Sequence, residues 1–341
     1  VFSQNPLAIG ISGEASFTVT FRKAQGASTV TADDGTRIAN TGIAVKVNPQ
    51  PAKHLQMLVS EVTPLPGTLW PGKDASGLQS KTAGVKFSVT VNAIDDYSNP
   101  STVNSDHTVT IESTNAYYGL TIPGSSTVIA SRTMNGGKTV IDVVLYAAVP
   151  QVIKVRDIAM PAGDSALTDD TLNLVVNPNN AVTKKLLVLM PNETIVPGEG
   201  LTGKTGLVGS VTAGSTMTVT VYACDAWYNQ VGTYQPQVTF VKDNQFDAAP
   251  VTGAATVISG GMKVFTGGVA LKAAGVGRKV TVTAAGYTSS AGTGLTVNAD
   301  ALKAVHVLMP GETNVPGSAT GRTGAVTDQT AGVAMPNPGM K

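Results

Sequence analysis

The feature that most constrains this chain is a pattern of short motifs that occurs three times along its 341 residues. Each copy starts with one or two lysines and an apolar stretch, and these stretches begin at Lys53, Lys184 and Lys303, which lie 131 and 119 residues apart. The landmarks that follow are Pro-Gly (66–67, 197–198 and 316–317) and Thr-Ala-Gly (82–84, 212–214 and 330–332). A repeat of this length predicts a row of similar domains rather than one large domain.

Strict alternation of apolar and polar residues follows the first two Thr-Ala-Gly landmarks. A period of two with one apolar side is the pattern of a half-buried antiparallel strand. The predicted core residues of these strands are Phe87, Val89, Val91, Met217, Val219 and Val221. Each strand ends in a turn rich in Asp and Asn (95–100 and 225–229), where Asx side chains bond their own backbone. Glycine pairs (136–137 and 260–261), apolar runs (140–147 and 264–271) and closing Val-Asn strands (47–48, 176–177 and 297–298) complete the pattern.

About seven short strands per copy, with turn signals every 8 to 12 residues or so, predict an immunoglobulin-like sandwich. The expected fold class is all-β, with tandem immunoglobulin-like β-sandwich modules in an elongated array. Residues 51–179 and 180–300 match complete modules. Residues 1–50 match only the C-terminal part of a module, and residues 301–341 match only the N-terminal part, a first strand and its long loop.

The two incomplete ends allow two interpretations. The chain is an excerpt of a longer polypeptide, or the C-terminal part of one copy completes the N-terminal part of the next. The second arrangement would give head-to-tail fibres by strand addition. Both arrangements cover the strand edges that an isolated fragment would expose. Repeat arrays commonly extend past any one segment, so we favour the excerpt.

Composition excludes several classes of partner. Only 13% of the residues are charged and the net charge is +1, so the chain lacks the basic field that nucleic acids and anionic membranes require. No apolar run approaches the ~18 residues of a membrane-spanning helix. The first six residues lack the charged and apolar regions of a signal peptide, which has been removed or lies outside an excerpt. We expect no nucleic-acid partner and no membrane insertion of this segment.

These motifs resemble the bacterial immunoglobulin-like repeats, of the invasin-like or Big-like type, of large cell-surface and filament proteins. The resemblance is carried by the apolar first strand, the long Pro-Gly loop, and Thr-Ala-Gly followed by Phe-Ser-Val-Thr-Val (87–91) or Met-Thr-Val-Thr-Val (217–221). The Asp-rich turn and the Val-Asn strand add to it. The resemblance implies export, an extracellular or cell-surface location, and a scaffolding or adhesive task. It does not identify a ligand, because this fold carries many functions.

One stretch matches a nucleotide-binding motif. Residues 198–205, Gly-Glu-Gly-Leu-Thr-Gly-Lys-Thr, fit G-x-x-x-x-G-K-[ST]. A phosphate-binding loop opens directly into a helix, whereas Gly-Leu-Val-Gly-Ser follows here. The counterpart at 317–323 has lost one residue and the lysine. We therefore predict a surface loop and no cofactor.

The Asp-rich turns raise the question of calcium. Asp95, Asp96 and Asn99, and Asp225 and Asn229 in the next copy, offer clustered oxygens. Two or three side-chain oxygens fall short of the ~6 to 8 ligands that Ca²⁺ takes. Asx-capped turns explain the same residues, so no metal ligand is predicted.

No catalytic residue is predicted, and the chain is not expected to be an enzyme. His54, His107 and His306 stand in or beside predicted strands, away from any second ligand, and we expect them to be exposed. Cys224, the only cysteine, follows the end of a strand and is interpreted as a small core residue. The sequence contains no G-x-S-x-G or H-E-x-x-H motif and no paired carboxylates in a catalytic context.

Aromatic residues lie mainly in the predicted loops: Trp70, Tyr97, Tyr117, Tyr118, Trp227, Tyr228 and Tyr234. They could stack on a glycan or anchor a partner protein. Alternatively they cap the open ends of the sandwiches against the adjoining module. The equivalent repeat positions of Tyr97 and Trp227 favour capping. A sequon, Asn192-Glu193-Thr194, permits N-glycosylation of a predicted loop.

The leading hypothesis is a non-catalytic structural segment of an exported surface, surface-layer or filament protein, acting as a rigid spacer or self-assembling scaffold. Its partners would be neighbouring modules or copies of itself. Proline in the linkers 48–51 and 177–179 restricts bending, because it fixes its own φ angle. One alternative is an adhesin that binds a glycan or a surface protein through loop aromatics. Another is an accessory module of a secreted enzyme.

Overall fold

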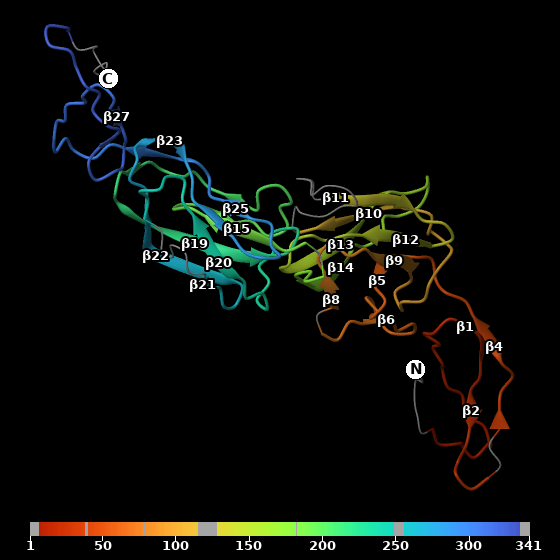
Figure 1. Cartoon of the computed structure of the whole chain (residues 1–341). Coiled ribbons are helices and arrows are strands. Elements are labelled where there is room, and N and C mark those ends of the chain that lie inside the picture. The colour runs from red at the N-terminus through yellow and green to blue at the C-terminus, as the bar shows by residue number, and fades with distance from the viewer. Residues whose placement is uncertain are drawn as a thin grey trace. The chain divides into compact units, whose positions relative to one another are not determined.

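A computed structural model of the chain describes residues 7–37, 40–77, 79–114, 128–181, 183–248 and 256–334. Within these ranges every regular element is a β-strand, so the expected all-β fold is confirmed. The chain divides into two compact units, Val1–Asn177 and Pro178–Lys341 (Figure 1). The predicted boundary between residues 179 and 180 lies just after this division. No helix in the described ranges is long and apolar enough to cross a membrane.

The first unit contains a two-layer sandwich. One sheet has the strand order β11-β10-β13-β14-β8, and the other has the order β12-β9-β5. Neighbouring strands are antiparallel except β14 and β8, which are parallel. The strands are β5 (His54–Leu58), β8 (Gln79–Thr82), β9 (Phe87–Ile94), β10 (Thr108–Ser113), β11 (Val128–Thr133), β12 (Lys138–Val143), β13 (Pro150–Ala159) and β14 (Asp170–Asn177).

The alternation in the sequence becomes the inner faces of these strands. Of the six predicted core residues, Val89, Val91, Met217, Val219 and Val221 are buried. Phe87, the first residue of β9, is only half-buried, and the centre of its ring lies 5.1 Å from the Lys81 ammonium. Burying one aliphatic side chain such as Val89 stabilises a fold by about 2 kcal/mol. The buried side chains of β9, the central strand of its sheet, therefore contribute several such increments to the sandwich.

The Pro-Gly loop explains why the first strand is buried on both faces. β5 lies at the edge of its sheet, yet its residues from Leu55 to Leu58 are all buried. The loop folds over it as a small hairpin of β6 (Thr63–Pro64) and β7 (Lys73–Asp74). The buried Gln56 amide donates to the carbonyls of Pro71 and Gly72, at 3.0 and 2.8 Å. The loop is therefore part of the folded module.

The second unit repeats this plan. β19 pairs with β15 and β22 as β9 pairs with β5 and β12. Further sheets of the second module have the orders β21-β20-β24-β25, β18-β26-β23 and β16-β17. The strands are β15 (Lys185–Leu189), β16 (Thr194–Ile195), β17 (Lys204–Thr205), β18 (Val211–Thr212), β19 (Thr216–Cys224), β20 (Gln237–Val241), β21 (Thr256–Val257), β22 (Met262–Ala270), β23 (Gly275–Arg278), β24 (Thr281–Thr283), β25 (Ser290–Ala291) and β26 (Leu295–Asn298). Phe240 and Phe265 meet edge to face in its core, with ring centroids 4.9 Å apart.

The N-terminal segment of the first unit has the register of a module's last strands. β1 (Gln25–Ser28) pairs with β4 (Val45–Val47), and β2 (Thr31–Ala32) pairs with β3 (Asn40–Thr41). Gln25 faces Val47 as Gly275 faces Val297 in β23 and β26. The two strand pairs occupy the same place in the repeat.

The C-terminal segment differs from the expectation in one respect. Its hairpin, β27 (Thr313–Asn314) and β28 (Arg322–Thr323), matches β6 and β7. The predicted first strand is not formed, and Val305 and Val307 are 86% and 71% exposed. In the complete modules this strand pairs with β9 or β19, and the described residues after 301 contain no such partner. A strand is stable only when its backbone groups are paired.

Candidate functional site

The loop that matches the nucleotide-binding motif is occupied by its own side chains. Lys204 Nζ donates to the Val188 carbonyl at 2.9 Å and to Glu193 at 3.0 Å. The amides of Leu201, Thr202 and Gly203 all donate to the Glu199 carboxylate. Burial alone would raise the pKa of Glu199, but these donors outweigh it and lower the pKa. The groups that would cradle a phosphate are already used, and the loop continues into β17 rather than a helix.

A basic side chain binds the equivalent first-segment carbonyl in all three copies, with a carboxylate beside it that differs in position, and this contact was not predicted from the sequence. Lys73 donates to the Met57 carbonyl and to Asp170, and these two side chains are only 6% and 5% exposed. Arg322 donates to the Val307 carbonyl at 3.0 Å and to Glu312 at 3.2 Å. Each cation ties the Pro-Gly hairpin to the first segment of its copy. The available signal was a basic residue five or six positions after each Pro-Gly.

The turns at 95–99 and 225–229, called the Asp–Asn turns below, are closed by one buried carboxylate each. Asp95 Oδ1 accepts the amides of Tyr97 and Asn99 at 2.9 and 3.0 Å. Its Oδ2 accepts the amide of Gln50, in the linker, at 3.0 Å. Asp225 accepts the equivalent three amides, from Trp227, Asn229 and Asn179. Asx-type hydrogen bonding accounts for these acids, and each acid also holds the linker that enters its module.

A cation at the Asp–Asn turns would have to displace these amides. The Asn99 amide nitrogen donates to both oxygens of Asp95, and Asp96 is paired with Lys53 and His54 instead. Lys53 lowers the pKa of Asp96 by donating a hydrogen bond to it, and His54 adds to the effect. In the described ranges no three His, Cys, Asp or Glu side chains gather as a metal ion would require.

The first Asp–Asn turn also contacts the segment that precedes its module. Asn99 Nδ2 donates to the Arg22 carbonyl at 2.7 Å, and its Oδ1 accepts the Ala24 amide at 2.8 Å. The Arg22 guanidinium lies 5.3 Å from the centre of the Tyr97 ring. The Tyr97 carbonyl in turn accepts the amide of Gly67, in the Pro-Gly loop. Turn, loop and preceding segment thus form one connected group.

The loop aromatics that the structure describes contact residues of their own units. Trp70, 36% exposed, donates to the Leu55 carbonyl and stacks on His54 with centroids 5.2 Å apart. Tyr234 donates to the Asn180 carbonyl at 2.9 Å and meets Tyr287 edge to face. Lys185 lies over the ring of Tyr228. Tyr117 and Tyr118 fall outside the described residues.

The histidines and the cysteine differ in environment. The prediction that His107 is exposed is wrong, because Asp157 on β13 and Asn104 close over it. Its Nδ1 lies 2.7 Å from Asp157 Oδ2. His54 is half-buried against Asp96, and His306 is exposed but lies outside any strand. Burial raises the pKa of the Cys224 thiol far above its usual value, which keeps it protonated and unreactive.

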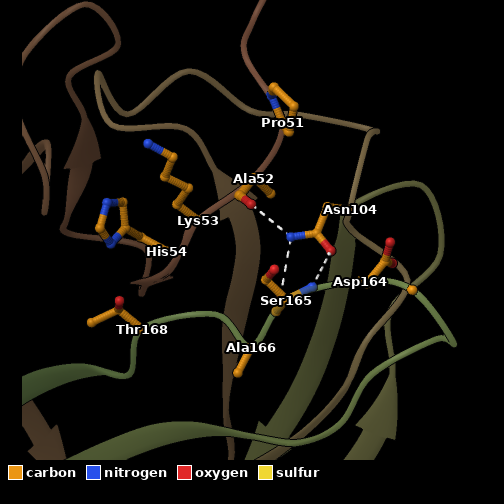
Figure 2. A pocket seen from close by; sticks show the side chains of 10 residues that line it. Pro51, Ala52, Lys53, His54, Asn104, Asp164, Ser165, Ala166 and Thr168 are labelled. Carbon is orange, nitrogen blue, oxygen red and sulfur yellow. Dashed lines mark hydrogen bonds between the residues drawn. The ribbon is translucent and has the colours of Figure 1, made fainter.

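A cavity of about 560 Å³ opens beside His107 and its partner Asn104, which lines it. Figure 2 shows its walls, which are residues 51–54, Asn104, and residues 163–166 and Thr168 of the segment between β13 and β14. The Asn104 side chain bridges the two sides, because it donates to the Ala52 carbonyl at 2.8 Å and accepts the Ser165 amide at 3.2 Å. In the second module Tyr234 follows Asn229 at the distance at which Asn104 follows Asn99, and Tyr287 precedes Thr288 as Leu167 precedes the equivalent Thr168.

The facing sheets, the strand order and the pairing of the first strand with β9 or β19 define immunoglobulin-like β-sandwiches. No protein-family model matches the sequence, and a search of curated proteins finds no match. Among solved structures, the chain is similar to the Escherichia coli adhesin FdeC, at 15% identity over 77% of this chain and 68% of that one, with a TM-score of 0.26.

Two further similarities involve larger proteins. A Salmonella α-2-macroglobulin mutant matches at 10% identity over 79% of this chain, with a TM-score of 0.30. A Bacteroides uniformis β-glucuronidase matches at 9% identity over 65% of this chain, with a TM-score of 0.24. This chain spans only 18% and 24% of those two proteins. Similarity at this level identifies no family and transfers no function.

Proposed function

We propose that this chain is a non-catalytic structural segment of an exported surface or filament protein, in which immunoglobulin-like modules act as rigid spacer blocks. The observation that carries the proposal is the fixation of the linkers. The buried carboxylates of Asp95 and Asp225 bind the amides of Gln50 and Asn179, at 3.0 and 2.9 Å. A spacer benefits from such fixation, because each hydrogen bond removes backbone freedom that the linker prolines alone do not.

The chemistry of the loops supports a structural role. Lys73, Lys204 and Arg322 each bind a carbonyl and a carboxylate of their own copy. Glu199 is saturated by loop amides, and Cys224 is a buried thiol. Export rests on the resemblance of the repeat to surface-protein modules. The expected partners are neighbouring modules or further copies of the chain, joined in one version by strand addition.

Two measurements test this proposal. Spin labels placed one in each unit report the distance between the units by pulsed electron paramagnetic resonance. A rigid spacer gives one narrow distance distribution, and a distribution as broad as that of a flexible tether contradicts it. Antibodies against the chain should label intact cells of the source organism. Labelling only after lysis would contradict export.

One observation favours the adhesin alternative. The partly exposed Trp70 stacks on His54, and His54 lines the cavity of Figure 2. An aromatic face beside polar groups is a common setting for a sugar ring. A glycan array probed with the chain tests this, with Trp70→Ala as the matched variant. Binding lost in that variant supports the adhesin, and an array without hits removes it. The accessory-module hypothesis is tested by reading the flanking sequence of the gene for a catalytic domain.

A further inference from the structure

The glycines of two Pro-Gly loops touch the preceding copy of the repeat. Gly67 has φ +91°, and a Cβ built there would lie 2.9 Å from the Cβ of Lys23. Gly317 has φ +86°, and its Cβ would lie 3.0 Å from the backbone nitrogen of Ala273. The first contact lies within the first unit and the second within the second unit. Both glycines are required by the approach of the neighbouring backbone as well as by their conformation.

The two contacted residues stand at the same place in the repeat. Lys23 lies two residues before β1, and Ala273 lies two residues before β23. β1 and β23 pair with their closing strands in matching register. Because the side chains at this place differ and the close approach is repeated, the fit depends on the backbone of the preceding copy.

Where Gly67 contacts Lys23, the Asp–Asn turn also forms hydrogen bonds with the backbone on either side of Lys23. The side-chain amide of Asn99 donates a hydrogen bond to the Arg22 carbonyl and accepts one from the Ala24 backbone amide, as the backbone of a neighbouring strand would. Asn99 is itself oriented by Asp95, which also holds the linker residue Gln50. The Arg22 guanidinium covers the Tyr97 ring. One buried turn thus fixes the linker and the preceding segment together.

We propose that the Asp–Asn turn and the Pro-Gly loop form a docking surface for the end of another module of this type. The partner is the backbone immediately before the strand that pairs with the closing strand of the preceding module, β1 or β23, and it is represented by residues 22–24 and 272–274. This inference rests on the proposed spacer function and specifies the source of its rigidity. Modules are held by direct backbone docking, and linker prolines are secondary.

The test compares two glycine substitutions in the full chain. Gly67→Ala adds a methyl group against Lys23, whereas Gly77→Ala adds one at nearly the same φ, +88°, with nothing within 4 Å. Both carry the strain of alanine at positive φ, so their difference isolates the docking contact. The readout is hydrogen exchange of the Ala24 amide, which donates to Asn99. We expect exchange about tenfold faster in Gly67→Ala and within about twofold of the wild type in Gly77→Ala.

A second pair of variants guards against unfolding of the module. The amide of Met57, bonded to Asp170, reports whether the sandwich stays folded. If Gly67→Ala abolishes the protection of the Met57 amide, the module has unfolded. The Arg22→Ala variant then tests the docking contact instead, because Arg22 lies outside the sandwich. Its control is Arg37→Ala, whose side chain is 83% exposed. We expect Ala24 to exchange several-fold faster in Arg22→Ala only.

Two results would overturn the docking proposal. One is an Ala24 amide that exchanges in the wild type as fast as an exposed amide. The other is a pair of variants, Gly67→Ala and Gly77→Ala or Arg22→Ala and Arg37→Ala, with the same effect. Failure of the spacer function is distinguishable, since a chain found only inside cells could still protect Ala24.

Discussion

The ends at which the linkers enter the two complete modules share one set of backbone hydrogen bonds, called the frame below. They differ in the side chains that pack beside these bonds, called the filling below. Both have an Asp–Asn turn that holds the linker, and in both a glycine carbonyl, Gly137 or Gly261, accepts the amide of Ala93 or Ala223. The first module is polar here, with the His107 and Asp157 pair beside an open cavity. The second has Tyr234 and Tyr287 packed together under Lys184. The backbone frame is therefore set by the turn, and the filling can change without altering the fold.

The largest expected effect breaks the shared frame. Asp95→Ala and Asp225→Ala each leave three buried or partly buried amides without an acceptor, which costs about 3 to 5 kcal/mol of unfolding free energy. The loss should be similar in the two modules, because the two carboxylates accept equivalent amides. Urea unfolding measures it, and the two tryptophans, Trp70 and Trp227, report one unit each.

The control for this pair is Asp74→Ala, which removes an exposed turn contact to Ser76 and should cost less than about 1 kcal/mol. If only one of the two buried aspartates proves costly, the turns are not equivalent and the common frame is wrong.

The next effect concerns the filling. Tyr234→Ala removes an aromatic pair and a hydrogen bond to the Asn180 carbonyl, at an expected cost of about 3 kcal/mol. Asn104→Ala in the first module removes hydrogen bonds beside an open cavity, where water can replace them, and should cost about 1 kcal/mol. The difference between these losses, from the same urea curves, sharpens the comparison. Equal losses would mean that the cavity residues are packed as tightly as the tyrosines.

These residues also show what could be predicted from the sequence. The burial of Val89 and Val91 and the formation of the Asp–Asn turns were predictable, because alternation and Asx turns are local in the chain. The burial of His107 was not, since its partner Asp157 lies 50 residues further on. The Lys73 and Asp170 pair spans 97 residues, and the contact of Gly67 with Lys23 depends on the fold of two copies. Such contacts require the strand order, which the repeat alone does not specify.

The smallest expected effect uses pH to separate the two Pro-Gly loops. The amides of Gly203, Thr202 and Leu201 lower the pKa of Glu199 despite its partial burial, whereas the first module has Thr68 at this position. A carboxyl whose pKa is lower in the folded state stabilises that state above its ordinary pKa, and the contribution is lost as the pH falls through the folded-state value.

The stability of the second unit should therefore decrease below the ordinary glutamate value of 4.5, by less than about 1 kcal/mol for a partly exposed group. Glu199→Gln should remove this part of the pH dependence, as followed by thermal unfolding monitored at Trp227. The loop amides would keep a carbonyl acceptor but lose the charge, so stability at neutral pH should fall by the same amount, less than about 1 kcal/mol. An unchanged acid profile in Glu199→Gln would show that the loop of the second module responds to pH no more than that of the first.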